Sequence, residues 1–323
     1  MPRNITSKKA MLHIIGRIFN MLTHYHFMLF SSKNLSKYYG SHLALDNITV
    51  NVKEGAIGLL GPNGAGKSTL LRILIGLLEP SSGQYQLLGG TESGNNDFVG
   101  YMPEHDCLPP KISAVGFVSY FGQLSGLPSD IAMERTHQTL DYVGLAEERY
   151  REIDSYSTGM KQRLKLAQAL VHDPDVLFLD EPTNGMDPQG REEMLDLLKD
   201  LVSMGKSIVL SSHILVDVEL VCEEVIILNN GVIIEQEKVE KLLGAGSLRL
   251  KINGDVELFI KNLKDRGHHA FKVHGEIHID DKIASHEIWD VALQSDVQIR
   301  YMGFRSKSLE DLFLDLMEGK NGN

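Results

Sequence analysis

The sequence contains little cysteine and no long apolar run. Only Cys107 and Cys222 occur among its 323 residues. Two isolated thiols cannot build a disulfide framework or a zinc site, and their scarcity favours a reducing compartment. No stretch reaches the roughly eighteen uninterrupted apolar residues that a membrane-spanning helix requires. If this protein works on a membrane, another chain must cross it.

The sequence also lacks an excess of basic residues. Lysine and arginine total 32 against 43 aspartates and glutamates, which gives a net charge of -11. This balance argues against a general polyanion binder, so nucleic acid is not an expected partner. The length allows two domains, one of them with a substantial core.

Residues 1–28 differ in composition from the rest. Their formal charges are all basic, and the first acid of the chain is Asp46. Apolar residues recur on one helical face here, which is typical of a basic amphipathic helix on an anionic membrane. A weak signal peptide is a second interpretation, although Arg17 and Asn20 interrupt its apolar part. The preferred interpretation is an extra or disordered segment upstream of a translation start at Met28.

A glycine-rich stretch fits the pattern G-x-x-x-x-G-K-[ST]. It lies between the apolar run 57–60 and the helix-like run 70–78. Its glycines let successive N–H groups point into one hollow, where they and the following helix N-terminus receive phosphate oxygens. Lys67 would reach the β- and γ-phosphates, and the Ser68 hydroxyl would bind Mg²⁺. The expected binding residues are Gly61, Pro62, Asn63, Gly64, Ala65, Gly66, Lys67, Ser68 and Thr69.

Two acids follow a second apolar run. Asp180 and Glu181 come directly after 176–179. An apolar strand that ends in acids is where a parallel sheet presents groups to a ligand. Asp180 would hold Mg²⁺, mostly through water, and Glu181 would orient or deprotonate an attacking water. The alternative is a pair of acids that caps a helix.

Four weaker signals accompany these motifs. Ser157-Thr158-Gly159 opens a helix-like run, which is an anion-binding shape. His213 follows a strand-like run and would contact a γ-phosphate or be an ordinary surface residue. Tyr39 would stack on an adenine ring or be an ordinary strand tyrosine. Glu104 ends a short strand-like run.

In this order the motifs resemble those of the ATP-binding cassette (ABC) ATPases. The most similar group exports drugs, lipids or ions and has its ATPase as a separate chain with a C-terminal extension. The resemblance covers about residues 29–240. It implies that Tyr39 stacks on adenine, that 61–69 is the Walker A loop and that Asp180 and Glu181 form Walker B.

The resemblance assigns further roles. Ser157 to Met160 falls on the signature motif, Asp187 on the D-loop and His213 on the switch histidine. Glu104 stands where the family usually has a glutamine that contacts Mg²⁺ and faces the membrane partner, so the oxygen ligand is kept and a charge is added. Thr158 replaces a usual glycine of the signature, whereas Ser157 and Gly159 remain.

The resemblance implies an enzyme that hydrolyses ATP to ADP and phosphate with Mg²⁺, using Lys67, Glu181 and His213. It implies head-to-tail pairing with a second copy or a paralogous ATPase, and a separate membrane-spanning permease. The expected location is the cytoplasmic face of the plasma (inner) membrane, as a peripheral subunit. Two alternatives are a soluble cassette ATPase that acts on ribosomes or DNA, and an inactive ATP sensor. The sensor is disfavoured because Lys67, Asp180, Glu181 and His213 are all present.

The expected fold is α/β, a P-loop ABC nucleotide-binding domain over 29–243 with a mixed sheet, an antiparallel β subdomain and a helical insert. We expect breaks in the insert at Gly122 and at 126–128. After a linker at 244–247, strand and helix patterns follow the order βαββαβ, with a final helix over 308–317. This order predicts a small ferredoxin-like α+β domain over 244–323, for which the resemblance offers a regulatory or dimer-supporting role.

Overall fold

The computed structural model describes residues 28–88, 98–105, 107–243, 247–273, 275–279 and 283–305. Residues 1–27 of the predicted N-terminal extension, the linker residues 244–246 and the predicted final helix 308–317 lie outside the described residues.

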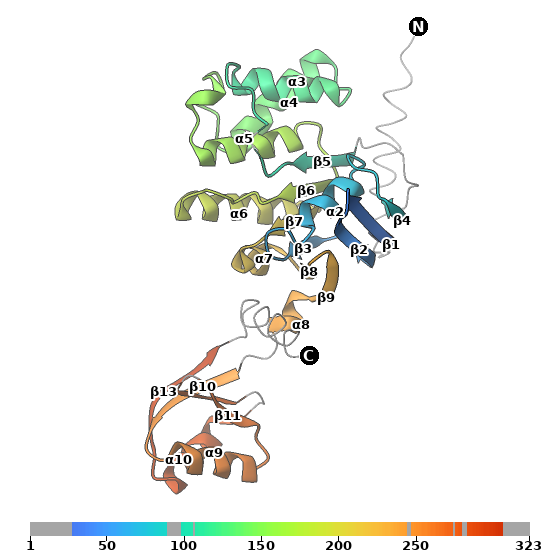
Figure 1. Ribbon diagram of the computed structural model, residues 1–323. Coiled ribbons are helices and arrows are strands. Elements are labelled where there is room, and N and C mark those ends of the chain that lie inside the picture. Colours follow the sequence, from blue (N-terminus) through green and yellow to red (C-terminus); the bar gives the residue numbers. More distant parts are fainter. Residues whose placement is uncertain are drawn as a thin grey trace, which may run out of the picture.

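Six strands form the main sheet, in the order β5-β6-β7-β3-β8-β9 (Figure 1). The first five run parallel, and β9 pairs antiparallel with β8. Their bounds are β5 (Val99–Met102), β6 (Val176–Asp180), β7 (Ser207–Ser212), β3 (Ala56–Leu60), β8 (Glu224–Asn229) and β9 (Val232–Lys238). The hairpin predicted at 229–231 is confirmed by β8 and β9.

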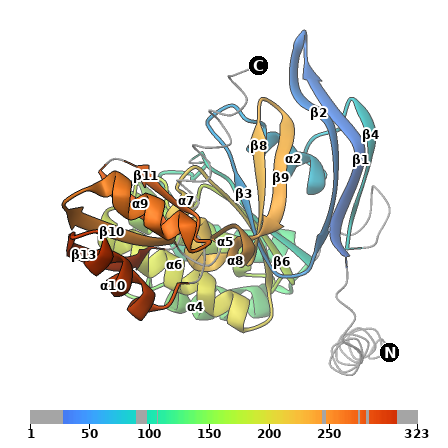
Figure 2. The ribbon, with the colours of Figure 1, turned by 90° about the horizontal axis from the view of Figure 1, so that it is seen from below.

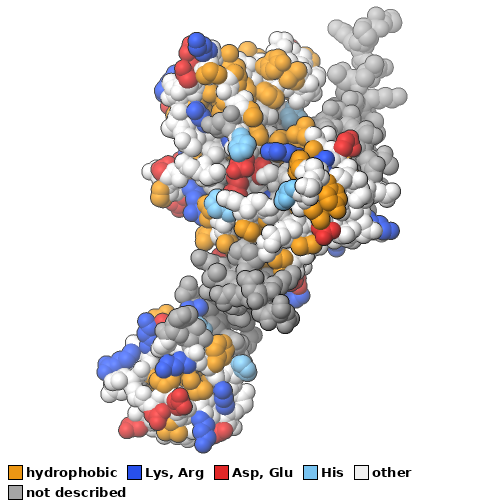
Figure 3. Space-filling model, in the orientation of Figure 1, with side chains coloured by type: hydrophobic (Ala, Val, Ile, Leu, Met, Phe, Trp, Pro, Cys, Tyr) orange, Lys and Arg blue, Asp and Glu red, His pale blue; other side chains and the backbone are white. Residues whose placement is uncertain are grey.

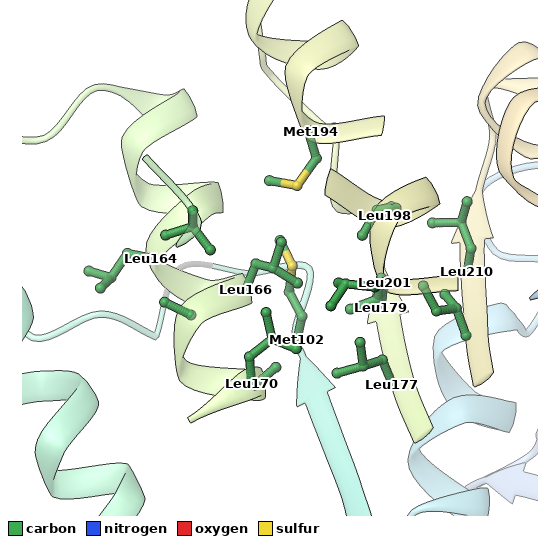
Figure 4. Close-up of a cluster of buried hydrophobic side chains, with 14 of the residues drawn as sticks. Met102, Leu164, Leu166, Leu170, Leu177, Leu179, Met194, Leu198, Leu201 and Leu210 are labelled. Atoms are coloured by element: carbon green, nitrogen blue, oxygen red, sulfur yellow. The ribbon is translucent and has the colours of Figure 1, made fainter. Parts of the chain in front are cut away.

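The parallel strands are buried on both faces, as the sequence predicts. Val176 and Phe178 of β6 belong to one hydrophobic cluster, whereas Leu177 and Leu179 belong to another. Successive side chains of a strand point to opposite faces, so one apolar run serves two cores. Figure 4 shows the second core, where leucines of two helices meet Leu177, Leu179 and Met102.

Helices cover both faces of this sheet. The core in Figure 4 lies under α5 (Thr158–Leu170), α6 (Pro188–Ser203) and α7 (Leu215–Val221). On the other face, α2 (Lys67–Leu74) packs between the main sheet and a smaller antiparallel sheet. That sheet has the order β2-β1-β4, with β1 (Met28–Tyr39), β2 (His42–Lys53) and β4 (Ser82–Leu87), and confirms the predicted antiparallel β subdomain. Figure 2 shows it beside the β8–β9 hairpin.

The helical insert consists of α3 (Ala114–Leu124) and α4 (Ser129–Tyr142). The predicted break at 126–128 is confirmed, but the predicted break at Gly122 is wrong, because Gly122 lies inside α3. A Cβ atom at Gly122 would lie 3.2 Å from the Cβ of Ala132 and 3.3 Å from Cγ2 of Val171. The glycine therefore lets α3 pack closely on its neighbours. Within the described part of the chain, no helix has the length and apolarity needed to cross a bilayer.

The C-terminal elements have the predicted βαββαβ order. They are β10 (Ser247–Asn253), α9 (Val256–Asp265), β11 (Ala270–Val273), β12 (Glu276–Ile279), α10 (Ser285–Gln294) and β13 (Gln298–Arg305). The strands form an antiparallel sheet in the order β11-β12-β10-β13, which is the ferredoxin-like arrangement. Leu250, Phe259 and Val291 belong to a hydrophobic cluster of this unit alone. The predicted fold class is confirmed.

Helix α7 was not expected from the sequence. It packs on β3, where a Cβ atom at Gly58 would lie only 2.2 Å from Cγ1 of Val218. We predict that Gly58→Ala lowers the free energy of unfolding by about 1–3 kcal/mol, since it overpacks a filled core. Thermal and urea unfolding would measure the change.

The matched control is Gly116→Ala in α3, where a new Cβ would lie 3.4 Å from Oγ of Ser113, an ordinary contact distance. This substitution should raise the free energy of unfolding by about 0.5–1 kcal/mol, because alanine loses less conformational entropy than glycine in a helix. Val218→Ala should restore part of the stability of Gly58→Ala, and an unchanged midpoint for Gly58→Ala would contradict the packing account.

Candidate functional site

The predicted phosphate loop lines an open pocket of about 290 Å³. Side chains and backbone from β1, β2, the loop and the ends of β5 and β6 surround it. Its lining residues are Tyr39, His42, Ala44, Asn63, Gly64, Ala65, Gly66, Lys67, Ser68, Thr69, Glu104 and Glu181. The structure therefore brings Tyr39, Glu104 and Glu181 to the loop, as the sequence predicts.

The loop backbone needs glycine at the point where α2 begins. Gly66 has φ 105°, a conformation that L side chains rarely adopt. A Cβ atom there would also lie 2.7 Å from the Ala44 carbonyl oxygen and 2.7 Å from Cδ2 of Leu45. With the loop curled in this way, the N-terminus of α2 opens at the pocket, and such helix ends favour anions.

Lys67 is the first residue of α2 and is only 6% exposed. Its Nζ atom donates hydrogen bonds to the carbonyl oxygens of Gly61 at 2.7 Å and Pro62 at 3.3 Å. The same atom lies 3.6 Å from Oε1 of Glu181. The lysine thus joins the glycine loop to the acid that follows β6.

Asp180 is fully buried at the end of β6. Its Oδ1 atom accepts hydrogen bonds from Oγ of Ser68 at 3.1 Å and from Oγ of Ser211 at 2.5 Å. Its Oδ2 atom is buried and has no hydrogen-bond partner among the described residues. A carboxylate oxygen without a partner, next to a hydroxyl, suits a hard divalent cation such as Mg²⁺. Ser211 was not among the predicted site residues, and its only signal in the sequence is its place at the end of a neighbouring parallel strand.

Glu181 adopts a left-handed backbone conformation with φ 52°. Its N–H donates to the carbonyl oxygen of Ser211 at 3.1 Å and to the hydroxyl of Ser211 at 3.2 Å, which offsets the strain. Its Oε2 atom lies 2.8 Å from Nδ1 of His213. The predicted water-activating acid and the predicted switch histidine are therefore in direct contact.

The predicted signature and D-loop residues line a different pocket of about 200 Å³. Ser157, Gly159 and Asp187 lie there with Arg163 and Glu193, which form an ion pair. The Ser157 hydroxyl caps α5 by accepting the N–H of Met160, and Thr158 is exposed. None of these predicted residues lines the pocket of Lys67, so the structure separates them within one chain.

A buried network holds the segment between Glu181 and Asp187. Asp217 of α7 accepts hydrogen bonds from Oγ1 of Thr183 at 2.6 Å and from Nε of Arg191 at 2.7 Å. Gln162 of α5 donates to the Asn184 carbonyl oxygen at 2.8 Å. Sequence reasoning missed this network because its members lie far apart in the chain.

A third hollow of about 330 Å³ lies between α2, β5, α3 and α5. We call it the α3 groove, and its lining residues are Ile75, Leu77, Val99, Tyr101, Pro103, Cys107, Leu108, Phe117, Phe121, Lys165 and Gln168. Burial raises the pKa of the Tyr101 hydroxyl above its ordinary value. Tyr120 and Leu124 of α3 are exposed, and Figure 3 shows hydrophobic side chains gathered over the part of the molecule where α3 and α4 lie.

Comparisons with known proteins point to one family. A family model described as ABC transporter matches residues 45–184. The chain is 32% identical over 304 residues to the linearmycin resistance ATP-binding protein LnrL of Bacillus subtilis (strain 168), covering 89% of this chain and 98% of the relative. It is 37% identical over 220 residues to the Nod factor export ATP-binding protein I of Ralstonia nicotianae (strain ATCC BAA-1114 / GMI1000), covering 67% of this chain and 68% of that relative.

Solved structures agree with this result. A dimeric ATP-binding cassette in a post-hydrolysis state, bound to ADP and Pi, superposes with a TM-score of 0.60 at 26% identity. The match covers 65% of this chain and 99% of that structure.

The buried network predicts a stability effect away from the nucleotide pocket. Because Asp217 is fully buried and holds both Thr183 and Arg191, Asp217→Ala should lower the free energy of unfolding by about 2–4 kcal/mol. Urea unfolding measures the loss. The control Asp196→Ala removes an exposed partner of Lys199 and should change stability by less than about 0.5 kcal/mol. Equal effects of the two substitutions would contradict the assigned role of the network.

Proposed function

This chain belongs to the ABC transporter ATP-binding proteins, and we propose that it drives export through a separate permease by closing and opening a dimer on ATP. It is an ATP-binding, ATP-hydrolysing transporter subunit. The transport interpretation is confirmed over the ribosome or DNA alternative, because relatives matched over most of their length carry the names of export and resistance ATPases. Those names support export as the direction of transport.

The separation of two half-sites carries the proposal. One pocket is lined by Lys67, Ser68 and Glu181, with the buried Asp180 hydrogen-bonded to Ser68. The other is lined by Ser157 and Asp187. A γ-phosphate bound to the first alone would lack the donors of a signature, and preorganised donors supply much of the stabilisation of a transition state. A second copy placed head to tail would bring its signature to the first pocket. A similar cassette has been solved as a dimer in two structures, which supports this pairing.

The proposed metal ligands fit Mg²⁺. The Ser68 hydroxyl, the Oδ2 atom of Asp180 and the Glu104 carboxylate are oxygen donors, which hard cations prefer. Bound Mg²⁺ would neutralise charge on the β- and γ-phosphates. The Ser68 hydroxyl, which donates to Oδ1 of Asp180, would lie beside the ion together with Oδ2 of that carboxylate.

The remaining residues divide the work of hydrolysis. Lys67 would bind phosphate oxygens, and Tyr39, 45% exposed at the pocket edge, would stack on adenine. Glu181 would orient the attacking water and take its proton, while His213 would hold the Glu181 carboxylate and contact the γ-phosphate. Water would attack in line with the leaving oxygen, so the protein mainly supplies position and charge neutralisation.

The α3 groove would receive a helix of the permease. Phe117 and Phe121 give it an apolar wall, and Tyr120 and Leu124 extend that apolar surface along α3. An apolar helix end fits such a groove. We place the subunit at the cytoplasmic face of the inner membrane, with 29–243 as the ATPase domain and 244–323 as a regulatory or dimer-supporting domain.

Glu181→Gln separates binding from chemistry. The amide keeps the size of the side chain but cannot accept the proton of water, so turnover should fall by about 10²–10⁴-fold while ATP binding persists. The variant should accumulate as an ATP-bound dimer, which light scattering coupled to size exclusion would detect. A monomer at saturating ATP and Mg²⁺ would contradict the composite site. The exposed Glu192→Gln of α6 is the control and should behave as the wild type.

Affinity purification from detergent-solubilised native membranes tests the partner. We expect a polytopic membrane protein in equal amount, because the groove needs an apolar occupant. Alanine at the exposed Tyr120 and Leu124 together should remove that protein while ATP binding is kept. Recovery of the wild type with ribosomes, or without any partner, would count against the transporter proposal.

A further inference from the structure

Lys165 is a lysine in the middle of α5 that is only 1% exposed. Burial of an ammonium group is unfavourable unless strong hydrogen bonds compensate. Its Nζ atom donates to the carbonyl oxygens of Pro103 at 3.0 Å and Glu104 at 2.9 Å. These carbonyls belong to the segment that leaves β5 and enters the nucleotide pocket.

The position of Lys165 links two hollows. Its side chain lines the α3 groove, whereas the side chain of Glu104 lines the nucleotide pocket. A planar peptide whose oxygen is held has a restricted orientation, and this orientation sets the direction in which Glu104 projects. Gln162, three residues earlier in α5, holds the Asn184 carbonyl oxygen between Glu181 and Asp187. Helix α5 therefore forms hydrogen bonds to both segments that carry the acidic residues of the site, the one at Glu104 and the one after Glu181.

We propose that Lys165 is a positioning residue that fixes the Glu104 carboxylate for the divalent cation. This inference rests on the proposed function of the nucleotide pocket. Because Lys165 also borders the α3 groove, a change in the groove reaches the metal ligand through a single side chain. Partners around a metal ligand orient it, and their loss typically costs about 10–100-fold in metal affinity.

The test uses the full chain with a non-hydrolysable ATP analogue and Mn²⁺ as the metal probe. Electron paramagnetic resonance measures free Mn²⁺ and hence the affinity of the loaded protein. Lys165→Met, which keeps length and removes the donor, should weaken Mn²⁺ binding by about tenfold. Binding of the analogue without metal should stay unchanged. Gln168→Met, on the same helix and in the same groove, is the matched control and should bind Mn²⁺ as the wild type does.

A double variant distinguishes positioning from packing. If Lys165 acts through Glu104, Lys165→Met should cause no further loss of Mn²⁺ affinity in a Glu104→Ala background. An equal loss in both backgrounds would overturn the inference, as would wild-type Mn²⁺ affinity in Lys165→Met. Should Lys165→Met fail to fold, Lys165→Gln keeps a shorter donor and should show a smaller loss that again vanishes in Glu104→Ala. A wild type that binds no nucleotide would overturn the proposed function itself.

Discussion

The buried carboxylate of Asp180 is the interaction on which the site depends. Its Oδ1 atom accepts hydrogen bonds from the hydroxyl groups of Ser68 and Ser211. These bonds connect the glycine loop and α2 to β6 and β7. A carboxylate without solvent is stable only when its oxygens have partners. One oxygen has hydrogen-bond partners within the protein, and the other has none among the described residues, which is why we propose that oxygen as a cation ligand. The order β6-β7-β3 of the parallel strands brings these three groups to one edge of the sheet.

The chain carries two separate pockets, the nucleotide pocket and the pocket of Ser157 and Asp187, and we propose that neither is complete without a second copy. Helix α5 connects them. Ser157, of the predicted signature, caps the N-terminus of that helix. The helix passes both the α3 groove and the segment before Asp187. A movement of α5 would therefore displace residues of the α3 groove, of the predicted signature and of the segments that border the nucleotide pocket. In the proposed mechanism, this arrangement would make ATP-driven closure of two copies the same event as movement of a permease.

Local patterns in the sequence predicted much of the fold and most of the nucleotide pocket. The loop 61–69, the acids after β6, the hairpin at 229–231 and the C-terminal βαββαβ order all depend on neighbours in the chain. The failures depend on distant partners. From the sequence alone, Gly122 is typical of a helix break, but it lies inside a helix because Ala132 and Val171 pack closely against it. Helix α7 was not predicted because its packing depends on Gly58, which leaves room for Val218.

Site residues show the same division. Lys67 and Glu181 were identified from motifs, whereas Ser211, Asp217 and Lys165 were not. Each of these three acts through a group more than thirty residues away, as in the hydrogen bonds of Ser211 to Asp180, Asp217 to Thr183 and Lys165 to Glu104. Hydropathy and spacing do not record such pairs.

The most direct measurement is complementation between two inactive copies. Lys67→Ala removes the phosphate-binding lysine, and Ser157→Arg blocks the signature. Each purified copy alone should lack ATPase activity, and a mixture should regain it, because a mixed pair contains one intact loop facing one intact signature. Activity of Ser157→Arg alone, or a mixture as inactive as its components, would contradict a site shared between two copies.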